Sequence, residues 1–255
     1  MMTFDFTGKT AIITGAASGM ALLSTKNFLE LGANVVMVDI DEEKVKGIAA
    51  ELDEQYPGHV LGAGCDVRHY DEIQAVCEKA FETFGSIDIM INLAGGAEYR
   101  MLNVSYELEF PDTPIEVFDW SLDVNLKGQF YFDHCVLKYM RDQKSGVIIN
   151  IGSITGQEGC DHNIGYSASK SAAMNGMTKS MALYGAKYGI RVVCVAPGPV
   201  LTRPGMASMK TPMGRAGDPQ ELVDAFVFLA SEHSGFTTGV NILIDGGRDI
   251  ARDKT

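Results

Sequence analysis

The sequence lacks the features that mark membrane, secreted and nucleic-acid-binding proteins. Among its 255 residues, no apolar stretch is long enough to cross a bilayer. The opening residues, MMTFDFTGKTAIITG, have neither the basic segment nor the long apolar run of a signal peptide. Positive charge is also scarce, since 21 Lys and Arg face 33 Asp and Glu, for a net charge of -12. We therefore expect neither a membrane nor a nucleic acid as partner.

Cysteine and histidine are few and scattered. The five cysteines are an odd number without a CxxC pair, at Cys65, Cys77, Cys135, Cys160 and Cys194. This pattern indicates reduced thiols in a cytoplasmic protein rather than a disulfide framework or a zinc site. The five histidines show no metal-ligand spacing, so no metal is expected.

Short β-rich runs alternate with longer amphipathic segments along the whole chain. The runs are apolar on both faces, which is typical of a parallel sheet covered by helices on both sides. The runs that predict strands lie at 10–15, 34–40, 59–67, 87–95, 146–153, 190–198 and 240–247. The segments that predict helices lie at 18–31, 41–56, 71–84, 114–141, 164–188 and 218–232. This alternation predicts one α/β domain over residues 1–255, with a single doubly wound parallel sheet.

Two connections are longer than a turn requires and follow strand ends. They span about 96–113 and 198–217. In a doubly wound sheet, ligands bind at the carboxyl ends of the strands. We therefore predict that these two loops border the substrate.

A glycine-rich turn, TGAASGM at 14–20, joins the first strand to its helix. Gly15 and Gly19 let the backbone turn tightly and approach a ligand, and the helix N-terminus then offers free N–H groups to a pyrophosphate. Its place at the first strand–helix junction favours a dinucleotide site over a plain loop.

Asp39 ends the second strand, where a carboxylate can bind both ribose hydroxyls of NAD and repel a 2′-phosphate. The alternative is that Asp39 or Asp41 merely caps the next helix. Asp41 can cap, which leaves Asp39 for the ribose. No Arg or Lys occurs in 15–20 or directly after Asp39. The predicted cofactor is therefore NAD rather than NADP.

GYSASK at 165–170 sets the phenol of Tyr166 and the ammonium of Lys170 four residues apart, on one face of a predicted helix. A lysine there favours loss of the phenolic proton, whose unperturbed pKa is about 10. The pair could thus exchange protons near neutral pH. A half-buried Tyr beside a solvated Lys would look the same.

With a serine thirteen residues before Tyr166, the chain resembles the classical short-chain dehydrogenase/reductase family from about residue 7 to 247. The motifs occur in the family's order: TGAASGMA, CDV, NLAG, DVNLKG, IGS, YSASK and APGPVLT. Two positions depart from it, because Ala21 replaces a common third glycine and Leu93 replaces the second Asn of Asn-Asn-Ala-Gly. Neither departure touches the chemistry.

The resemblance implies a Rossmann-like fold and a catalytic tetrad. Tyr166 would be the general acid/base, and Lys170 would lower its pKa and bond the nicotinamide ribose. Ser153 would hold the substrate oxygen, and Asn125 would position a water in the proton relay. The resemblance also implies a set of cofactor-binding residues: Gly15, Ser18, Gly19, Met20, Asp39, Ile40, Asp66, Val67, Asn92, Ala94, Gly95, Tyr166, Lys170, Pro197, Gly198, Val200 and Thr202.

The predicted activity is NAD(H)-dependent interconversion of a secondary alcohol and a ketone. The stretch between Ser153 and Tyr166 is polar, and the loop after Gly95 adds Glu98, Tyr99 and Arg100. Convergent polar groups favour a sugar, polyol or similar polyhydroxylated substrate. The residues predicted to contact it are Gly96, Gln157, Glu158, His162, Asn163 and Met206.

Alternatives remain open. The polar side chains could instead face solvent, and the substrate could be a hydroxysteroid or a 3-oxoacyl thioester. A rival from another class is a dinucleotide-binding sensor or scaffold without catalysis. The resemblance further implies a homotetramer or homodimer, formed through the long helices and the last strand.

Overall fold

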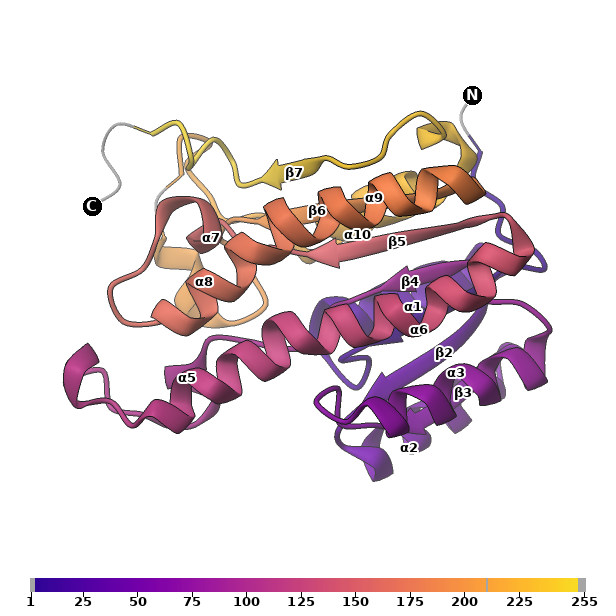
Figure 1. The fold of residues 1–255 in the computed structure, drawn as a ribbon, viewed down its shortest axis with the longest axis horizontal. Coiled ribbons are helices and arrows are strands. Elements are labelled where there is room, and N and C mark those ends of the chain that lie inside the picture. Colours follow the sequence, from indigo (N-terminus) through magenta and orange to yellow (C-terminus); the bar gives the residue numbers. More distant parts are fainter. Residues whose placement is uncertain (1–2, 210, 252–255) are drawn as a thin grey trace.

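The computed structural model describes residues 3–209 and 211–251, and a sheet of seven parallel strands lies at its centre (Figure 1). Along the sheet the order is β3-β2-β1-β4-β5-β6-β7, so the chain winds outward in both directions from β1. The strands are β1 (Thr10–Thr14), β2 (Asn34–Asp39), β3 (Val60–Gly64), β4 (Ile89–Ile91), β5 (Gly146–Ile151), β6 (Ile190–Pro197) and β7 (Asn241–Ile244). The predicted doubly wound parallel sheet is confirmed.

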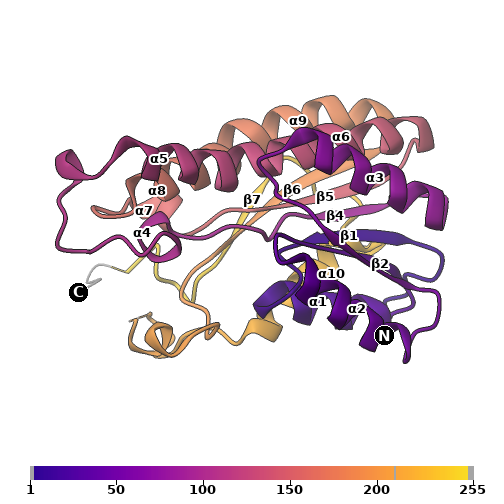
Figure 2. The same cartoon turned by 90° about the horizontal axis from the view of Figure 1, so that it is seen from below.

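Helices cover both faces of the sheet, as Figure 2 shows: α1, α2 and α10 on one side, and α3, α6 and α9 on the other. The helices are α1 (Gly19–Glu30), α2 (Glu42–Asp53), α3 (Tyr70–Phe84), α4 (Glu98–Met101), α5 (Ile115–Leu122), α6 (Gly128–Gln143), α7 (Thr155–Glu158), α8 (Ile164–Ala172), α9 (Thr178–Gly185) and α10 (Pro219–Ala230). In Figure 1, α5 and α8 extend beyond the carboxyl ends of the strands.

Successive side chains of the central strands enter two separate cores. Ile13 and Met37 pack in the core that includes α1, while their neighbours Ile12 and Val36 pack in the core that includes α3. All four are completely buried. Burying one such side chain contributes about 1.5–3 kcal/mol, and this two-sided burial explains the continuous apolar runs in the sequence.

The two long predicted helices each contain a π-helical turn. Asp123–Lys127 joins α5 to α6, and Ala173–Met177 joins α8 to α9. Such turns often mark functional positions, because they free a backbone group from the helical ladder. Two short helices, α4 and α7, were not predicted, because four residues are too few for a periodic apolar pattern.

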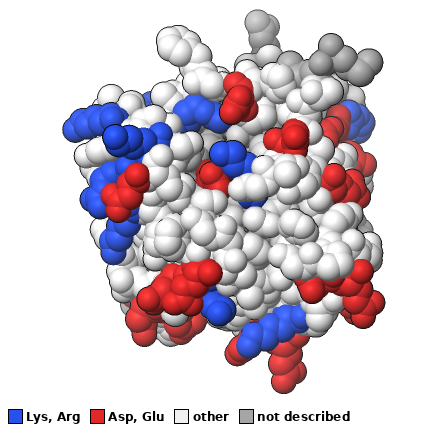
Figure 3. Space-filling model, turned by 90° about the vertical axis from the view of Figure 1, so that its right-hand side faces the viewer, with Lys and Arg blue, Asp and Glu red and all other residues white. Residues whose placement is uncertain are grey.

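The strands all end on one side of the molecule, at the left of Figure 1, where the loops after β1, β2, β4, β5 and β6 meet. The opposite side, seen in Figure 3, carries small groups of both charge signs around an uncharged centre. Within the described ranges, no helix combines the length and apolar character needed to span a bilayer.

Candidate functional site

Two adjoining cavities lie at the carboxyl ends of the strands. One, of about 350 Å³, lies over β1 and β2 and the glycine loop. The other, of about 430 Å³, lies over β5 and β6 beside Tyr166. Met20, Leu93 and Gly95 line both, so the cavities meet at the end of β4.

The glycine loop has the backbone shape that the sequence predicts. Gly15 and Gly19 adopt positive φ angles of 73° and 57°, where other residues are strained. A Cβ on Gly15 would also lie 3.2 Å from backbone atoms of Ala94. The loop therefore passes close to the chain after β4 and leaves the first turn of α1 facing the cavity, where its N–H groups suit an anion.

Asp39 and Asp41 have different roles. Asp41 accepts a hydrogen bond from the Lys44 N–H at 3.2 Å and caps α2, which confirms that part of the prediction. The Asp39 carboxylate accepts from Ala17 N–H at 3.0 Å and Asp41 N–H at 3.1 Å, and lines the first cavity. These two bonds fix the orientation of the carboxylate at the wall of the first cavity.

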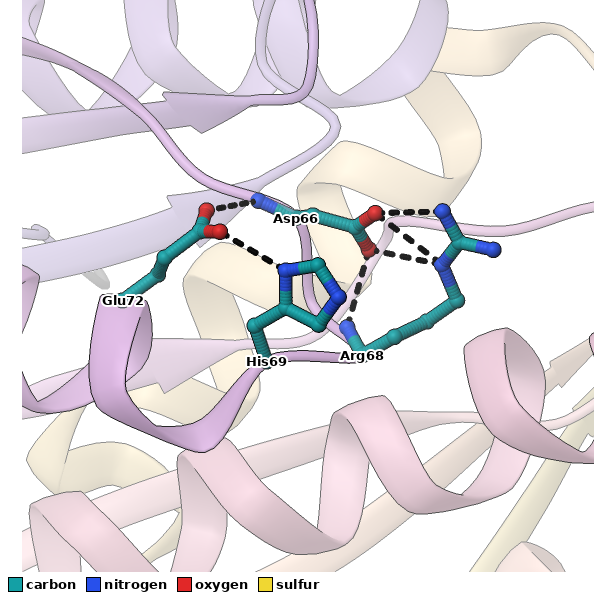
Figure 4. A network of polar contacts seen from close by, with 4 residues as sticks. All are labelled: Asp66, Arg68, His69 and Glu72. Carbon is teal, nitrogen blue, oxygen red and sulfur yellow. Dashed lines mark hydrogen bonds and ion pairs between the residues drawn. The ribbon is translucent and has the colours of Figure 1, made fainter.

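A polar network joins Asp66 and Arg68, which line the first cavity, to His69 and Glu72 (Figure 4). Arg68 donates from Nε to both oxygens of Asp66, at 2.9 and 3.0 Å, and lowers the pKa of that carboxyl. Glu72 accepts from the Asp66 N–H at 2.8 Å and contacts His69 Nδ1 at 2.7 Å. Arg68, which belongs to none of the sequence motifs, shares the cavity lining with Asp66.

Ser153, Tyr166 and Lys170 meet in the second cavity, although they come from the end of β5 and from α8. Lys170 Nζ donates to the Ile151 carbonyl at 3.0 Å and lies 5.5 Å from the centre of the Tyr166 ring. Burial lowers the pKa of Lys170 to about 8. The ammonium is thus held below the phenol by the last carbonyl of the strand.

Burial has the largest effect on Tyr166 and raises its pKa. The Ser153 hydroxyl and the nearby charges of Arg100 and Arg203 act against burial and lower the pKa. The sequence predicts a lowered Tyr166 pKa because of Lys170. In this structure the net direction is upward, because desolvation disfavours the phenolate more than these neighbours favour it.

Asn125 lies in the first π turn and is completely buried. Its side chain accepts from the Gly96 N–H at 2.9 Å and donates to the Gly96 carbonyl at 3.0 Å. Its own carbonyl accepts from Gln129 Nε2 at 2.6 Å, and the same amide reaches the Ile151 carbonyl at 3.2 Å. Gln129, which belongs to none of the sequence motifs, therefore links Asn125 to the carbonyl that holds Lys170.

Glu98 does not take the place that the sequence predicts for it in the polar loop beside the substrate. Its carboxylate is completely buried and accepts from the N–H groups of Gly165 and Tyr166, at 2.9 and 3.0 Å. It also accepts from the Ser121 hydroxyl at 3.1 Å. Glu98 therefore caps the helix of Tyr166 instead of facing the substrate, and Tyr99 is buried beside it.

Most of the predicted cofactor residues line one of the two cavities. The first is lined by Gly15, Ser18, Met20, Asp39, Ile40, Asp66, Val67, Ala94 and Gly95. The second is lined by Tyr166, Lys170, Pro197, Gly198, Val200 and Thr202. Asn92 lies beneath them, since its amide donates to Asp133 at 2.7 Å and to Asn150 at 2.9 Å in the core. Gly19 lies in neither lining and shapes the turn.

The predicted substrate residues divide into two groups. Gly96, Asn163 and Met206 line the second cavity. Gln157, Glu158 and His162 do not. Gln157 is exposed, Glu158 pairs with Arg248 at 3.1 Å, and His162 pairs with Asp161 at 2.8 Å. Among the described residues, no group of three or more His, Cys, Asp or Glu side chains could hold a metal ion.

A doubly wound sheet with a glycine loop at its first turn and a Ser-Tyr-Lys cluster beside it defines a class of dinucleotide-binding oxidoreductases. The family model described as short chain dehydrogenase matches residues 9–212. This chain belongs to the short-chain dehydrogenase/reductase family and is an oxidoreductase of that family.

Similar proteins have different named activities. The chain is 37% identical to a 3-oxoacyl-[acyl-carrier-protein] reductase of Thermotoga maritima, over 94% of this chain and 97% of the relative. It is 34% identical to a (2S)-[(R)-hydroxy(phenyl)methyl]succinyl-CoA dehydrogenase subunit of Thauera aromatica, over 95% and 97%. It is 33% identical to an NAD-dependent glycerol dehydrogenase of Listeria innocua, over 97% and 96%. These relatives support the family, and they do not agree on a substrate.

Proposed function

We propose that this protein is an NAD(H)-dependent dehydrogenase that interconverts a secondary alcohol and a ketone. The observation that carries this proposal is the meeting of Ser153, Tyr166 and Lys170 in a cavity that adjoins the glycine-loop cavity. Residues 1–255 act as one catalytic domain, and the loops at about 96–113 and 198–217 border the substrate.

The chain's own groups handle the proton. In oxidation, the Tyr166 phenolate takes the proton of the substrate hydroxyl while the Ser153 hydroxyl bonds that oxygen. In reduction, the phenol returns the proton. Lys170 stabilises the phenolate electrostatically from below the ring. Asn125, the fourth member, holds the Gly96 backbone in place against the catalytic helices. NAD, when bound, would accept or supply the hydride.

The residues proposed to hold the dinucleotide fit it by shape and charge. Only glycine fits at position 15, and the first turn of α1 can receive the pyrophosphate. Asp66 and Val67 border the adenine, and Pro197, Gly198 and Thr202 border the nicotinamide end.

Substitution of Tyr166 tests this mechanism directly. We expect Tyr166→Phe to reduce kcat by at least roughly 100-fold while NADH still binds, because the proton transfer loses its donor. Tyr56→Phe, at the other end of the molecule, is the matched control and should keep full turnover. Undiminished turnover in Tyr166→Phe would contradict the mechanism. An unsubstituted protein that binds NADH but turns over no substrate would instead favour the rival of a non-catalytic sensor or scaffold.

NAD is the proposed cofactor. The Asp39 carboxylate lines the first cavity at the end of β2 and supports this choice, since a 2′-phosphate on the adenosine ribose would meet a like charge there. Among the described residues that line this cavity, Arg68 is the only Lys or Arg, and its guanidinium is already engaged by Asp66. The relative named NAD-dependent glycerol dehydrogenase is consistent with this choice.

The proposed substrate is a sugar, a polyol or another polyhydroxylated alcohol. Support comes from the hydroxyl, amide and guanidinium groups in the second cavity, among them Thr155, Asn163 and Tyr106. A hydroxysteroid or a 3-oxoacyl thioester is the alternative, the second named for the Thermotoga maritima relative. A panel of sugars, polyols, hydroxysteroids and acyl thioesters, followed by NADH absorbance, distinguishes them. Steroid turnover far above every polyol would overturn this substrate class.

The protein is proposed to work in the cytoplasm as a homotetramer or homodimer. All five cysteines are free thiols, which suits a reducing compartment. Large apolar side chains are exposed on α6 and α9, including Phe130 at 46% and Leu183 at 75%. Exposed apolar groups on neighbouring helices are typical of a subunit interface.

A further inference from the structure

The cavity beside Tyr166 is positively charged, although the protein as a whole is acidic. Three cationic side chains line it: Arg100, Lys170 and Arg203. Among the described residues, no Asp or Glu shares this lining. In a chain of net charge -12, a cavity whose charged lining residues are all cations is a local reversal of the overall charge. Such a cavity concentrates anions and repels cations.

Arg100 and Arg203 reach the cavity from two different loops. Arg100 belongs to α4, in the loop after β4, and its guanidinium lies against Gly96 at the cavity wall. Arg203 belongs to the loop after β6, next to Thr202. Both charges act on the Tyr166 phenol. The two guanidinium groups therefore border the place where a substrate would meet Tyr166.

These two arginines differ from the others in having no protein partner. Within residues 3–209 and 211–251, no carboxylate or carbonyl bonds either guanidinium group. The remaining described arginines are all engaged. Arg68, Arg141, Arg215 and Arg248 pair with carboxylates, and Arg191 donates to the Leu229 carbonyl at 2.8 Å. Two guanidinium groups without a described protein partner thus distinguish this cavity from the surroundings of the other described arginines.

We propose that Arg100 and Arg203 bind an oxyanion, a carboxylate or a phosphate, at the end of the substrate remote from the reacting carbon. Guanidinium groups suit this purpose, because their fixed N–H fork matches both anions. The inference rests on the proposed function, since Ser153 and Tyr166 must hold the reacting oxygen. The substrate class becomes a polyhydroxylated acid or a sugar phosphate rather than a neutral polyol.

A competing assignment for these arginines is the pyrophosphate of the cofactor. We have already proposed that the first turn of α1 receives the pyrophosphate, and this turn and Ser18 line the other cavity. The two assignments differ in which KM responds to substitution. If the arginines served the pyrophosphate, their loss would raise the KM for NAD equally for every substrate.

The test uses a matched set of six-carbon ligands: sorbitol, gluconate and a sorbitol phosphate. Binding to the NAD-loaded protein is measured by calorimetry, and turnover by NADH absorbance. We expect at least one of the two anions to bind roughly tenfold or more tightly than sorbitol, which corresponds to one charge-assisted contact. Comparison of gluconate with the phosphate identifies which oxyanion the site prefers.

Arg100→Gln and Arg203→Gln should each weaken binding of the preferred anion by roughly tenfold, with binding of sorbitol and NAD unchanged. Arg141→Gln is the control, because it removes the same charge from an exposed pair at the far end of α6. Equal binding of sorbitol and both anions would overturn the proposal, as would variants that change only the KM for NAD. Because binding is read separately from turnover, an inactive protein that still prefers the anion would contradict the dehydrogenase and not this site.

Discussion

At the scale of single residues, the buried ammonium of Lys170 lowers the free energy of unfolding of the protein. Its ammonium is buried, with the Ile151 carbonyl as hydrogen-bond acceptor, and its pKa falls to about 8 from an ordinary 10.5. A lysine whose folded-state pKa is lowered binds fewer protons folded than unfolded between these two values. Stability therefore rises with pH across that window, and below pH 8 the buried charge carries its full cost.

Lys170→Met should make the protein inactive and, at neutral pH, more stable by up to a few kcal/mol, because an apolar side chain needs no solvation. The difference in the free energy of unfolding between Lys170→Met and the unsubstituted protein should shrink as the pH rises from about 8 toward 10.5. Urea unfolding of both proteins at several pH values measures this difference. A constant difference at every pH would show that Lys170 is not titrating in this range.

We expect the single charge of Asp39 to decide whether the protein uses NAD or NADP. A 2′-phosphate against this carboxylate would cost on the order of a few kcal/mol when partly desolvated. We expect kcat/KM with NAD to exceed kcat/KM with NADP at least tenfold. Asp39→Asn should lower this ratio, mainly by raising kcat/KM with NADP. Glu30→Gln, on the exposed end of α1, removes the same charge as a control. Equal use of both cofactors by the unsubstituted protein would contradict the role of Asp39.

At the scale of elements, one carboxylate joins the loop after β4 to α8. The N-cap residue of α8, Asn163, makes no side-chain capping bond. Glu98 of α4 supplies two acceptors instead, one for Gly165 N–H and one for Tyr166 N–H. The first turn of α8 is therefore held from outside the helix, and the position of Tyr166 depends on the fold of the 96–113 loop.

Glu98→Gln should lower the free energy of unfolding by roughly 1–3 kcal/mol, because an amide offers one acceptor oxygen for two buried N–H groups. The turnover number should fall as well, since the first turn of α8 carries Tyr166. Denaturant unfolding and kcat are the measurements. Glu109→Gln is the control, since this exposed side chain lies in the same loop. Two variants of equal stability and activity would rule out this coupling.

At the scale of the whole molecule, the exposed apolar side chains of α6 and α9 bear on the oligomeric state. Phe130 and Leu183 are too exposed to contribute to the core of one subunit. We expect the protein to have the mass of a dimer or tetramer in light scattering at micromolar concentration, and Leu183→Asp to reduce that mass. Phe81→Asp, at an exposed position of α3, is the matched control. A monomeric mass for the unsubstituted protein would contradict this prediction.

By itself, the sequence determined the order of strands and helices, the glycine turn, the cap at Asp41 and the Tyr166–Lys170 pair. These features depend on local patterns: apolar runs, glycines at a strand end, and a spacing of four on a helix. The same logic gave β4 as residues 87–95, but the structure pairs only Ile89–Ile91. The following residues leave the sheet to line the two cavities.

Only the tertiary structure decided which polar side chains face the second cavity. Glu98 and Arg100 are two residues apart in a loop, yet one is buried under α8 and the other lines the cavity. Glu158 turns to Arg248, 90 residues along the chain. The direction of each of these side chains depends on partners distant in sequence, because a buried charge must meet an opposite charge or N–H groups. A local sequence pattern does not show where those partners lie.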